Sequence, residues 1–225
     1  MKNQILLLLL IISVKVLGQK PELNKESIDY YFTYTDYVNN TPNLPEKAYI
    51  TVKMENPNSI IYKDINVSST DQKLKKGYTI WAIKYKGALY HNLLLTNYEI
   101  AQGHAFGKFA VTGKKINVIL LDTKRDKKAI GRNANPYGGG LVASALYKPN
   151  NTAWKDKEGN EYKVLFYNAE APFFSPTYKE NAFVTLLTTK DLVGLTNNDP
   201  LILDKMKNGE YYVEDFLEFA RKENE

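Results

Sequence analysis

Two histidines, His91 and His104, are the first candidates for acid–base chemistry because imidazole titrates near neutral pH. His91 lies in an alternating segment that is typical of a strand. His104 follows Gln102-Gly103 in a predicted loop, with no acidic residue close in sequence. Their spacing differs from the His-Glu-x-x-His pattern of a zinc helix. The chain also lacks a Gly-x-Ser-x-Gly turn and the Ser-x-x-Lys motif set. We therefore predict no catalytic triad and no metal site.

Carboxylates are numerous, but they form no pair that the sequence alone identifies. Glu210, Glu214, Asp215 and Glu218 recur at helical spacing and face away from the apolar stripe, which indicates a solvated helix face. Glycosidase carboxylates are defined by their separation in space. A hydrolase acting on an envelope polymer or glycan therefore remains the alternative function.

A glycine-rich segment is the only candidate for anion binding by backbone amides. Gly138-Gly139-Gly140 leads into the small apolar run Leu141–Leu146. A phosphate-binding loop would need Gly-Lys-Ser/Thr at its end, and Leu141 and Val142 stand there instead. We predict no cofactor. The segment Gly138–Leu146 is predicted as a buried helix, a strand or an exposed membrane-associated stretch, and these alternatives stay open.

Basic residues gather in the middle of the chain. From Lys73 to Lys128 there are twelve basic and three acidic residues, while both flanks are acidic. Many of these cations lie in or beside turns, so they could attract an anionic glycan, a lipid headgroup or an acidic protein surface. No nucleic-acid recognition motif is present. The predicted interaction surface consists of Lys114, Lys115, Lys124, Arg125, Lys127, Lys128, Trp81, Tyr85 and Tyr90.

The N-terminus has the layout of a secretory signal peptide. Lys2 precedes the apolar run Ile5–Val14, and Val16-Leu17-Gly18 offers a cleavage site before Gln19. The run is shorter than the about 20 apolar residues of a spanning helix, so cleavage is favoured over retention as a membrane anchor, which stays the minor alternative. The chain has no cysteine, so neither a lipid-anchored cysteine nor a disulfide is possible. We expect a periplasmic or secreted, freely soluble product.

Alternating apolar residues predict most of the mature chain to be strands joined by turns. The stretch Tyr30–Tyr37 fits either a strand or a short helix. Two hairpins are expected, one turning at Lys86-Gly87 and one at Gly113-Lys114. The predicted strands are Ala48–Glu55, Ile60–Val67, Tyr78–Tyr85, Ala88–Leu95, Phe106–Thr112, Ile116–Leu121 and Tyr162–Tyr167. Phe183–Leu187 is a further apolar stretch without an assigned element.

The end of the chain changes from strand to helix periodicity. Leu192–Met206 has helical spacing despite Gly194 and Pro200, and Val213–Arg221 carries an apolar helical face. Strands followed by helices predict an α+β fold, mostly antiparallel and sandwich- or barrel-like, with a helical part at about 190–223. No linker is evident, so residues 19–225 are predicted to form one domain.

Short motifs across the mature chain resemble an uncharacterised family of exported Bacteroidetes proteins. Phe32–Pro42 is similar to that family's Thr-aromatic-Glu-Asp-Phe stretch and the Asn-x-Pro after it, although Thr35 replaces the acidic residue. Trp81-Ala82-Ile83 with Gly87–Asn92 resembles its central hairpin, and Asp199-Pro200-Leu201 its terminal helix. The resemblance implies export and a shared β-rich fold, and it supplies no catalytic residue. From the tyrosine-rich strands and the basic turns we expect a non-enzymatic binding module of the cell envelope or exterior.

Overall fold

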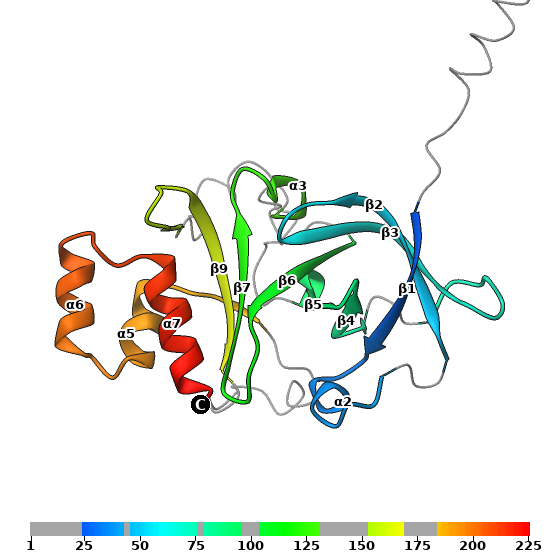
Figure 1. Cartoon of the computed structure of the whole chain (residues 1–225), viewed down its shortest axis with the longest axis horizontal. Helices are drawn as coiled ribbons and strands as arrows, with labels where there is room; N and C mark the ends of the chain where they lie inside the picture. Colours follow the sequence, from blue (N-terminus) through cyan, green and yellow to red (C-terminus); the bar gives the residue numbers. More distant parts are fainter. Residues whose placement is uncertain (1–23, 43–45, 76–78, 96–103, 131–152, 169–183) are drawn as a thin grey trace, which may run out of the picture.

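The computed structural model describes residues 24–42, 46–75, 79–95, 104–130, 153–168 and 184–225 (Figure 1). The predicted signal peptide and the segment Gly138–Leu146 lie outside the described residues. Among the helices that are described, none is long and apolar enough to cross a membrane. The predicted α+β class, mostly antiparallel with C-terminal helices, is confirmed.

The described elements alternate little between strand and helix: strands come first and the longer helices last. In chain order they are β1 (Asn24–Tyr31), α2 (Tyr34–Val38), β2 (Ala48–Glu55), β3 (Ser59–Val67), β4 (Ala82–Tyr85), β5 (Ala88–Asn92), the 3₁₀ turn η2 (Leu93–Leu95), β6 (Ala105–Val111), β7 (Ile116–Asp122), α3 (Lys127–Ile130), β8 (Trp154–Lys155), β9 (Glu161–Asn168), β10 (Thr185–Leu186), α5 (Thr189–Leu195), α6 (Pro200–Lys207) and α7 (Val213–Glu223).

Six strands close into a barrel. Their order is β6-β3-β2-β1-β4-β5, and β5 pairs with β6 to complete the ring. The closing register joins Tyr90 to Lys108 and Asn92 to Phe106, and every strand pair in the described residues is antiparallel. Closure removes the unpaired edges of the sheet. Of the two predicted forms, sandwich-like and barrel-like, the barrel is the one present.

Strand β6 belongs both to the barrel and to a second sheet. Its first residues pair with β3 and β5, while Phe109 and Val111 pair with β7 across a bulge. Strand β7 pairs with β9, which also pairs with β8 and β10. At Gly107 a Cβ atom would lie 2.9 Å from side chains of Ile119 and Leu93. Glycine therefore allows the second sheet to fold closely against the barrel wall.

The predicted hairpin at Lys86-Gly87 is confirmed and joins β4 to β5. Lys86 and Gly87 have φ angles of 47° and 78°, as a two-residue turn between twisted strands requires. Strand β5 ends at Asn92, earlier than predicted. The Asn92 amide donates to the Ile80 carbonyl at 2.9 Å and accepts from the Leu94 backbone at 3.1 Å. These bonds turn the chain into η2.

Strand and helix both occur in the ambiguous stretch Tyr30–Tyr37. Strand β1 ends at Tyr31, and α2 begins after Thr33. The Thr33 hydroxyl accepts from the Asp36 backbone at 3.0 Å, and the Asp36 carboxylate accepts from the Thr33 backbone at 2.9 Å. This capping box explains why a tyrosine-rich segment stops being a strand at this point.

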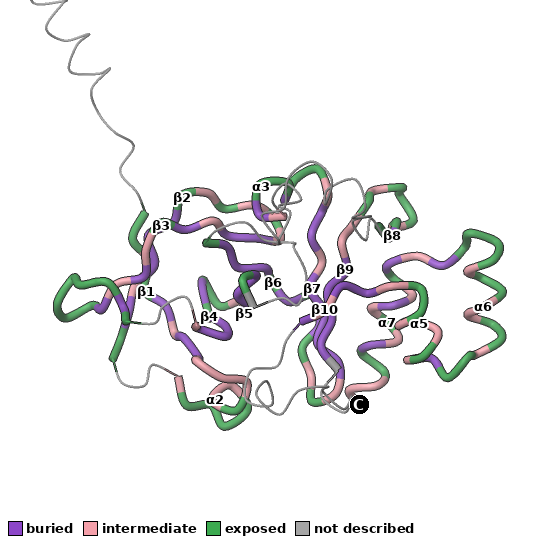
Figure 2. The backbone as a smooth tube through the Cα atoms, turned by 180° about the vertical axis from the view of Figure 1, so that it is seen from behind, coloured by how far each residue is buried: buried purple, intermediate pink, exposed green. Residues whose placement is uncertain are grey.

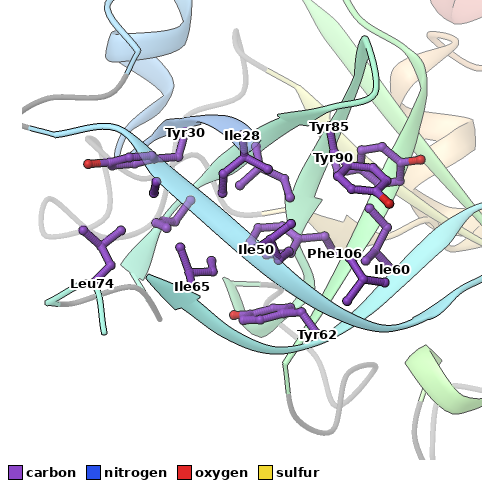
Figure 3. Packing of buried hydrophobic residues seen from close by; sticks show 14 of the residues in the cluster. Ile28, Tyr30, Ile50, Ile60, Tyr62, Ile65, Leu74, Tyr85, Tyr90 and Phe106 are labelled. Atoms are coloured by element: carbon purple, nitrogen blue, oxygen red, sulfur yellow. The ribbon is translucent and has the colours of Figure 1, made fainter. Parts of the chain in front are cut away.

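The core has three parts, separated by the barrel wall and the second sheet. One fills the barrel, with Ile50, Tyr62 and Phe106 among its side chains (Figure 3). A second lies between the barrel and one face of β7 and β9. A third packs α5, α6 and α7 on the opposite face of β7 and β9. Figure 2 shows that buried backbone concentrates in these strands, while α6 is exposed or half-buried throughout.

The helical spacing over Leu192–Met206 is divided between two helices, where the pattern predicted one continuous stretch. Helix α5 ends at Leu195 and α6 begins at Pro200. Between them Asn197 and Asn198 have φ angles of 52° and 58°, which end a helix, and Pro200 suits the first turn of the next one.

Candidate functional site

The strongest site among the described residues is the basic loop, defined here as residues 122–128. It runs from the last residue of β7 to the second residue of α3. Two aspartates shape it. The Asp122 carboxylate accepts hydrogen bonds from the backbone N–H groups of Lys124 and Arg125, both at 2.8 Å. Such a turn pulls the aspartate inward and leaves the next side chains pointing outward. Asp122 is accordingly buried.

Asp126 anchors the same loop to the turn between β2 and β3. Its carboxylate is fully buried and accepts from the Ser59 hydroxyl at 2.6 Å and from the Asn58 amide at 3.3 Å. It also accepts from the Asp122 backbone at 2.9 Å. Ser59 in turn accepts from the Asn56 amide at 2.9 Å. These bonds satisfy a buried carboxylate and hold the loop in one conformation.

In the basic loop the acidic side chains are buried and the basic side chains are exposed. Both carboxylates are turned into the fold, whereas Lys124, Arg125, Lys127 and Lys128 are exposed. The nearest ion pair joins Arg125 Nε to Asp122 at 3.8 Å, a length at which the pair gains little in water. The loop therefore presents four cations to solvent on a rigid base, although its sequence contains two acids.

Lys114 and Lys115 lie at the other end of β7, in the turn before it, so the structure does not bring them together with the basic loop (Figure 1). A strand of seven residues spans roughly 23 Å. That exceeds the Debye length of about 8–10 Å at moderate salt, so the two groups act separately. Lys115 also lies 3.9 Å from Glu223 of α7.

The three aromatic residues of the predicted surface, Trp81, Tyr85 and Tyr90, do not form an exposed face. Trp81 is fully buried between the barrel and the second sheet, and Tyr85 and Tyr90 lie inside the barrel (Figure 3). The Tyr85 hydroxyl donates to Glu55 at 3.0 Å. Because the sheet closes, one of its faces points inward and the other meets a second layer, which an open sheet would have left in water.

A surface ion pair occupies the turn of the β4–β5 hairpin. Lys86 Nζ lies 2.8 Å from Glu55 Oε2. This hydrogen bond from Lys86 holds the pKa of the Glu55 carboxyl below its usual value, and the same contact raises the pKa of Lys86. Lys86 is therefore a compensated cation and adds little to the field of the basic loop.

The histidines occupy different environments. His91 is fully buried on β5, with its ring 5.4 Å from that of Trp81 and 6.0 Å from that of Phe109. His104 is exposed before β6, and its ring lies 5.1 Å from that of Tyr62. No group of three His, Asp or Glu side chains that could hold a metal ion occurs in the described part of the chain.

The cavities in the described surface include the following two. One, of about 290 Å³, lies at a mouth of the barrel over Phe32 and Leu74, with Glu46, Lys73 and Lys75 also lining it. Glu46 is the one carboxylate among its described lining residues. The other, of about 430 Å³, lies between α5, α6 and β8 and has no carboxylate in its described lining. Neither cavity offers the pair of convergent carboxylates that the hydrolase alternative requires.

Neither the two aspartates, Asp122 and Asp126, nor the cavity beside α6 was predicted from the sequence. Acids within a run of cations are a usable signal, since an aspartate there either weakens the patch or organises it from inside. The cavity has no such signal, because its lining comes from four separate segments.

Comparison of the chain with protein-family models, with curated proteins and with solved structures finds no match. Its function must therefore be inferred from its own residues.

Proposed function

We propose that this protein is a non-enzymatic binding module, exported to the periplasm or the exterior, that holds an anionic partner on the basic loop. Export rests on the residues of Met1–Gly18, and membership of the exported Bacteroidetes family remains a proposal from the motifs given above. The observation that supports the binding role is that the carboxylates of the basic loop are buried while its cations are exposed. The carboxylates of Asp122 and Asp126 accept hydrogen bonds from backbone N–H groups of the loop, while four neighbouring cations are exposed to solvent.

An anionic glycan is the partner that these features favour. The four cations are distributed over a turn and one short helix. This arrangement suits the repeated charges of an extended polymer better than a single phosphate. The large apolar side chains exposed in the described residues are Val38, Leu94 and Leu201, and all three lie outside the basic loop. Contact at the loop is therefore electrostatic, without the apolar insertion that strengthens binding to bilayers.

Retention of the mature chain on immobilised polygalacturonate, with neutral dextran as the control matrix, tests this proposal. We expect binding that weakens steeply as salt rises from 50 to 200 mM, because exposed charges are screened. Reversing the four cations to glutamate should weaken binding at least tenfold. A matched variant carries the same change of charge at exposed lysines elsewhere: Lys47, Lys53, Lys63 and Lys190.

Equal losses in the two variants would show that net charge alone drives retention and would overturn the role of the basic loop. Binding confined to vesicles of anionic phospholipid would replace the glycan by a membrane surface. Circular dichroism of each variant checks that the fold is intact, since all eight positions are exposed.

The hydrolase alternative gains no specific support in the described residues. His91 and His104 contact different aromatic neighbours, and the two cavities lack paired carboxylates. The third option, membrane association through Gly138–Leu146, falls outside the described residues.

A further inference from the structure

We propose that the cavity between α5, α6 and β8 binds the aliphatic tail of a medium-chain carboxylate, with Lys207 beside the acid group. This site is separate from the basic loop and does not depend on the proposed function. Its volume of about 430 Å³ lies within the range of small-molecule pockets.

The walls of the cavity are mainly apolar. Val193 of α5 and Leu203 and Met206 of α6 are half-buried and line it, together with the rings of Trp154 and Tyr211. The rings meet edge to face, with centroids 6.2 Å apart. Met206 adds a flexible, polarizable wall that adapts to a chain of methylenes.

The polar atoms of the two aromatic wall residues leave the apolar ring surfaces available to a ligand. The indole Nε1 of Trp154 donates to the Leu187 carbonyl at 3.0 Å, so the ring offers its apolar surface. The Tyr211 hydroxyl is buried and has no hydrogen-bond partner among the described residues, so a ligand does not compete with an existing bond there. An aliphatic tail therefore meets apolar atoms without displacing a hydrogen bond.

Charge decides the end group of the ligand. Lys207 is an exposed cation that lines the cavity, and no carboxylate accompanies it among the described lining residues. The neighbouring Lys205 is engaged, because its Nζ lies 2.9 Å from the Asp215 carboxylate. One cation at the rim of an apolar cavity is complementary to an apolar molecule with one anionic end.

Helix α6 is suited to admit such a ligand. None of its residues is fully buried, whereas α7 buries Val213, Phe216 and Ala220. A helix held by few buried side chains opens at a low free-energy cost. Small displacements of α6 can therefore widen the cavity while α7 stays packed on the second sheet.

Titration of the full mature chain with hexanoate, octanoate and decanoate, below their micellar concentrations, tests the proposal. Trp154 lines the cavity and Trp81 is buried elsewhere, so a saturable change in tryptophan emission reports on binding. We expect the dissociation constant to fall about threefold to fourfold for each added methylene. Isothermal calorimetry provides an independent readout.

Two variants with a matched control test the geometry. Lys207→Glu should weaken decanoate binding about fivefold and should favour decylamine, because the rim charge is reversed. Lys190→Glu makes the same change of charge on α5 at an exposed lysine that does not line the cavity, and it should leave both affinities unchanged. Val193→Phe should narrow the cavity and weaken decanoate binding, which reduces the emission change at a given decanoate concentration.

Three results would overturn the proposal: no saturable signal with decanoate, affinities independent of chain length, or equal effects of Lys207→Glu and Lys190→Glu. Binding that persists unchanged in a folded Val193→Phe protein would also overturn it.

Discussion

At the scale of single residues, Asp126 shows how a buried charge can organise an exposed one. It accepts three hydrogen bonds, from Ser59, Asn58 and the backbone of Asp122, and it has no exposed surface. A buried carboxylate is stable only when its hydrogen-bonding capacity is filled, and these donors fill it. The geometry of the basic loop therefore depends on a residue whose charge opposes that of the loop.

Replacing Asp126 with alanine should destabilise the protein by about 2–3 kcal/mol, because the Ser59 hydroxyl and a buried backbone N–H lose their acceptor. Urea unfolding measures the loss. Asp204→Ala, at an exposed position of α6, serves as the matched control and should change stability by less than about 0.5 kcal/mol. Similar effects of the two substitutions would contradict the anchoring role.

Tyr62 links stability to alkaline pH. Burial, with a smaller contribution from Asp64, raises the pKa of its phenol from 10.0 to about 12. The folded state thus favours the neutral phenol. This stabilisation is complete below pH 10 and is lost as pH rises through 12. We expect the stability of Tyr62→Phe, relative to the natural chain, to improve by about 1 kcal/mol between pH 8 and pH 11.

Urea midpoints at the two pH values measure this effect, and Tyr37→Phe on α2 controls for the general loss of a hydroxyl. A constant difference between Tyr62→Phe and the natural chain across this pH range would show that Tyr62 does not titrate with unfolding.

At the scale of elements, Asn224 at the end of the C-terminal helix is hydrogen-bonded through its side chain to the β6–β7 turn. The Asn224 amide oxygen accepts from the backbones of Lys115 and Ile116, both at 2.9 Å, and its nitrogen donates to the Ile116 carbonyl at 2.7 Å. A Cβ atom at Gly113 would lie 2.0 Å from the Asn224 Cγ atom. The glycine therefore makes room for the amide.

Asn224→Ala should cost about 2 kcal/mol and should speed hydrogen exchange at the amides of Lys115 and Ile116. Gly113→Ala should be costly in the natural chain and much less so in the Asn224→Ala background, because the second change removes the clashing group. Additive effects of the two substitutions would contradict the contact. Glu225→Ala, at the neighbouring exposed position, provides the control.

At the scale of the whole molecule, β6 is the strand that the barrel and the second sheet share. It contributes Phe106 to the barrel core, Phe109 to the layer between the sheets and Val111 to the core beneath the helices. A substitution that loosens any of the three core clusters therefore removes packing from the same continuous strand, which favours cooperative unfolding.

Phe216→Ala, on α7, should destabilise the protein by about 3–5 kcal/mol by leaving a cavity beneath the helices. If the mature chain is one cooperative domain, far-ultraviolet circular dichroism and tryptophan emission will still give the same urea midpoint. Separate midpoints would show that the barrel unfolds independently of the helices. Leu201→Ala, at an exposed position of α6, should leave the midpoint nearly unchanged.

Local patterns predicted both hairpins and most of the strands, because these depend on alternation and on turn residues that are close in sequence. They missed most of β1 and placed the start of β4 too early. The turn at Lys86-Gly87 is an example, since its left-handed backbone follows from two adjacent residues. The end of β5 was harder to foresee, because Asn92 turns the chain through a bond to Ile80, twelve residues away. The prediction of an exposed aromatic surface was wrong for a similar reason. Whether Tyr85 faces water depends on the pairing of β5 with β6, which closes the barrel.

The α+β class, the antiparallel pairing of neighbouring strands and the concentration of cations in the middle of the chain could all be predicted from the amino-acid sequence. These depend on periodicity, turn chemistry and composition, which are local properties. Three features became evident only from the folded structure: the cations divide between the two ends of β7, Asp126 holds one group in place, and α5, α6 and β8 line an open cavity. Each of these requires residues distant in sequence to meet, and that meeting is set by barrel closure and layer packing.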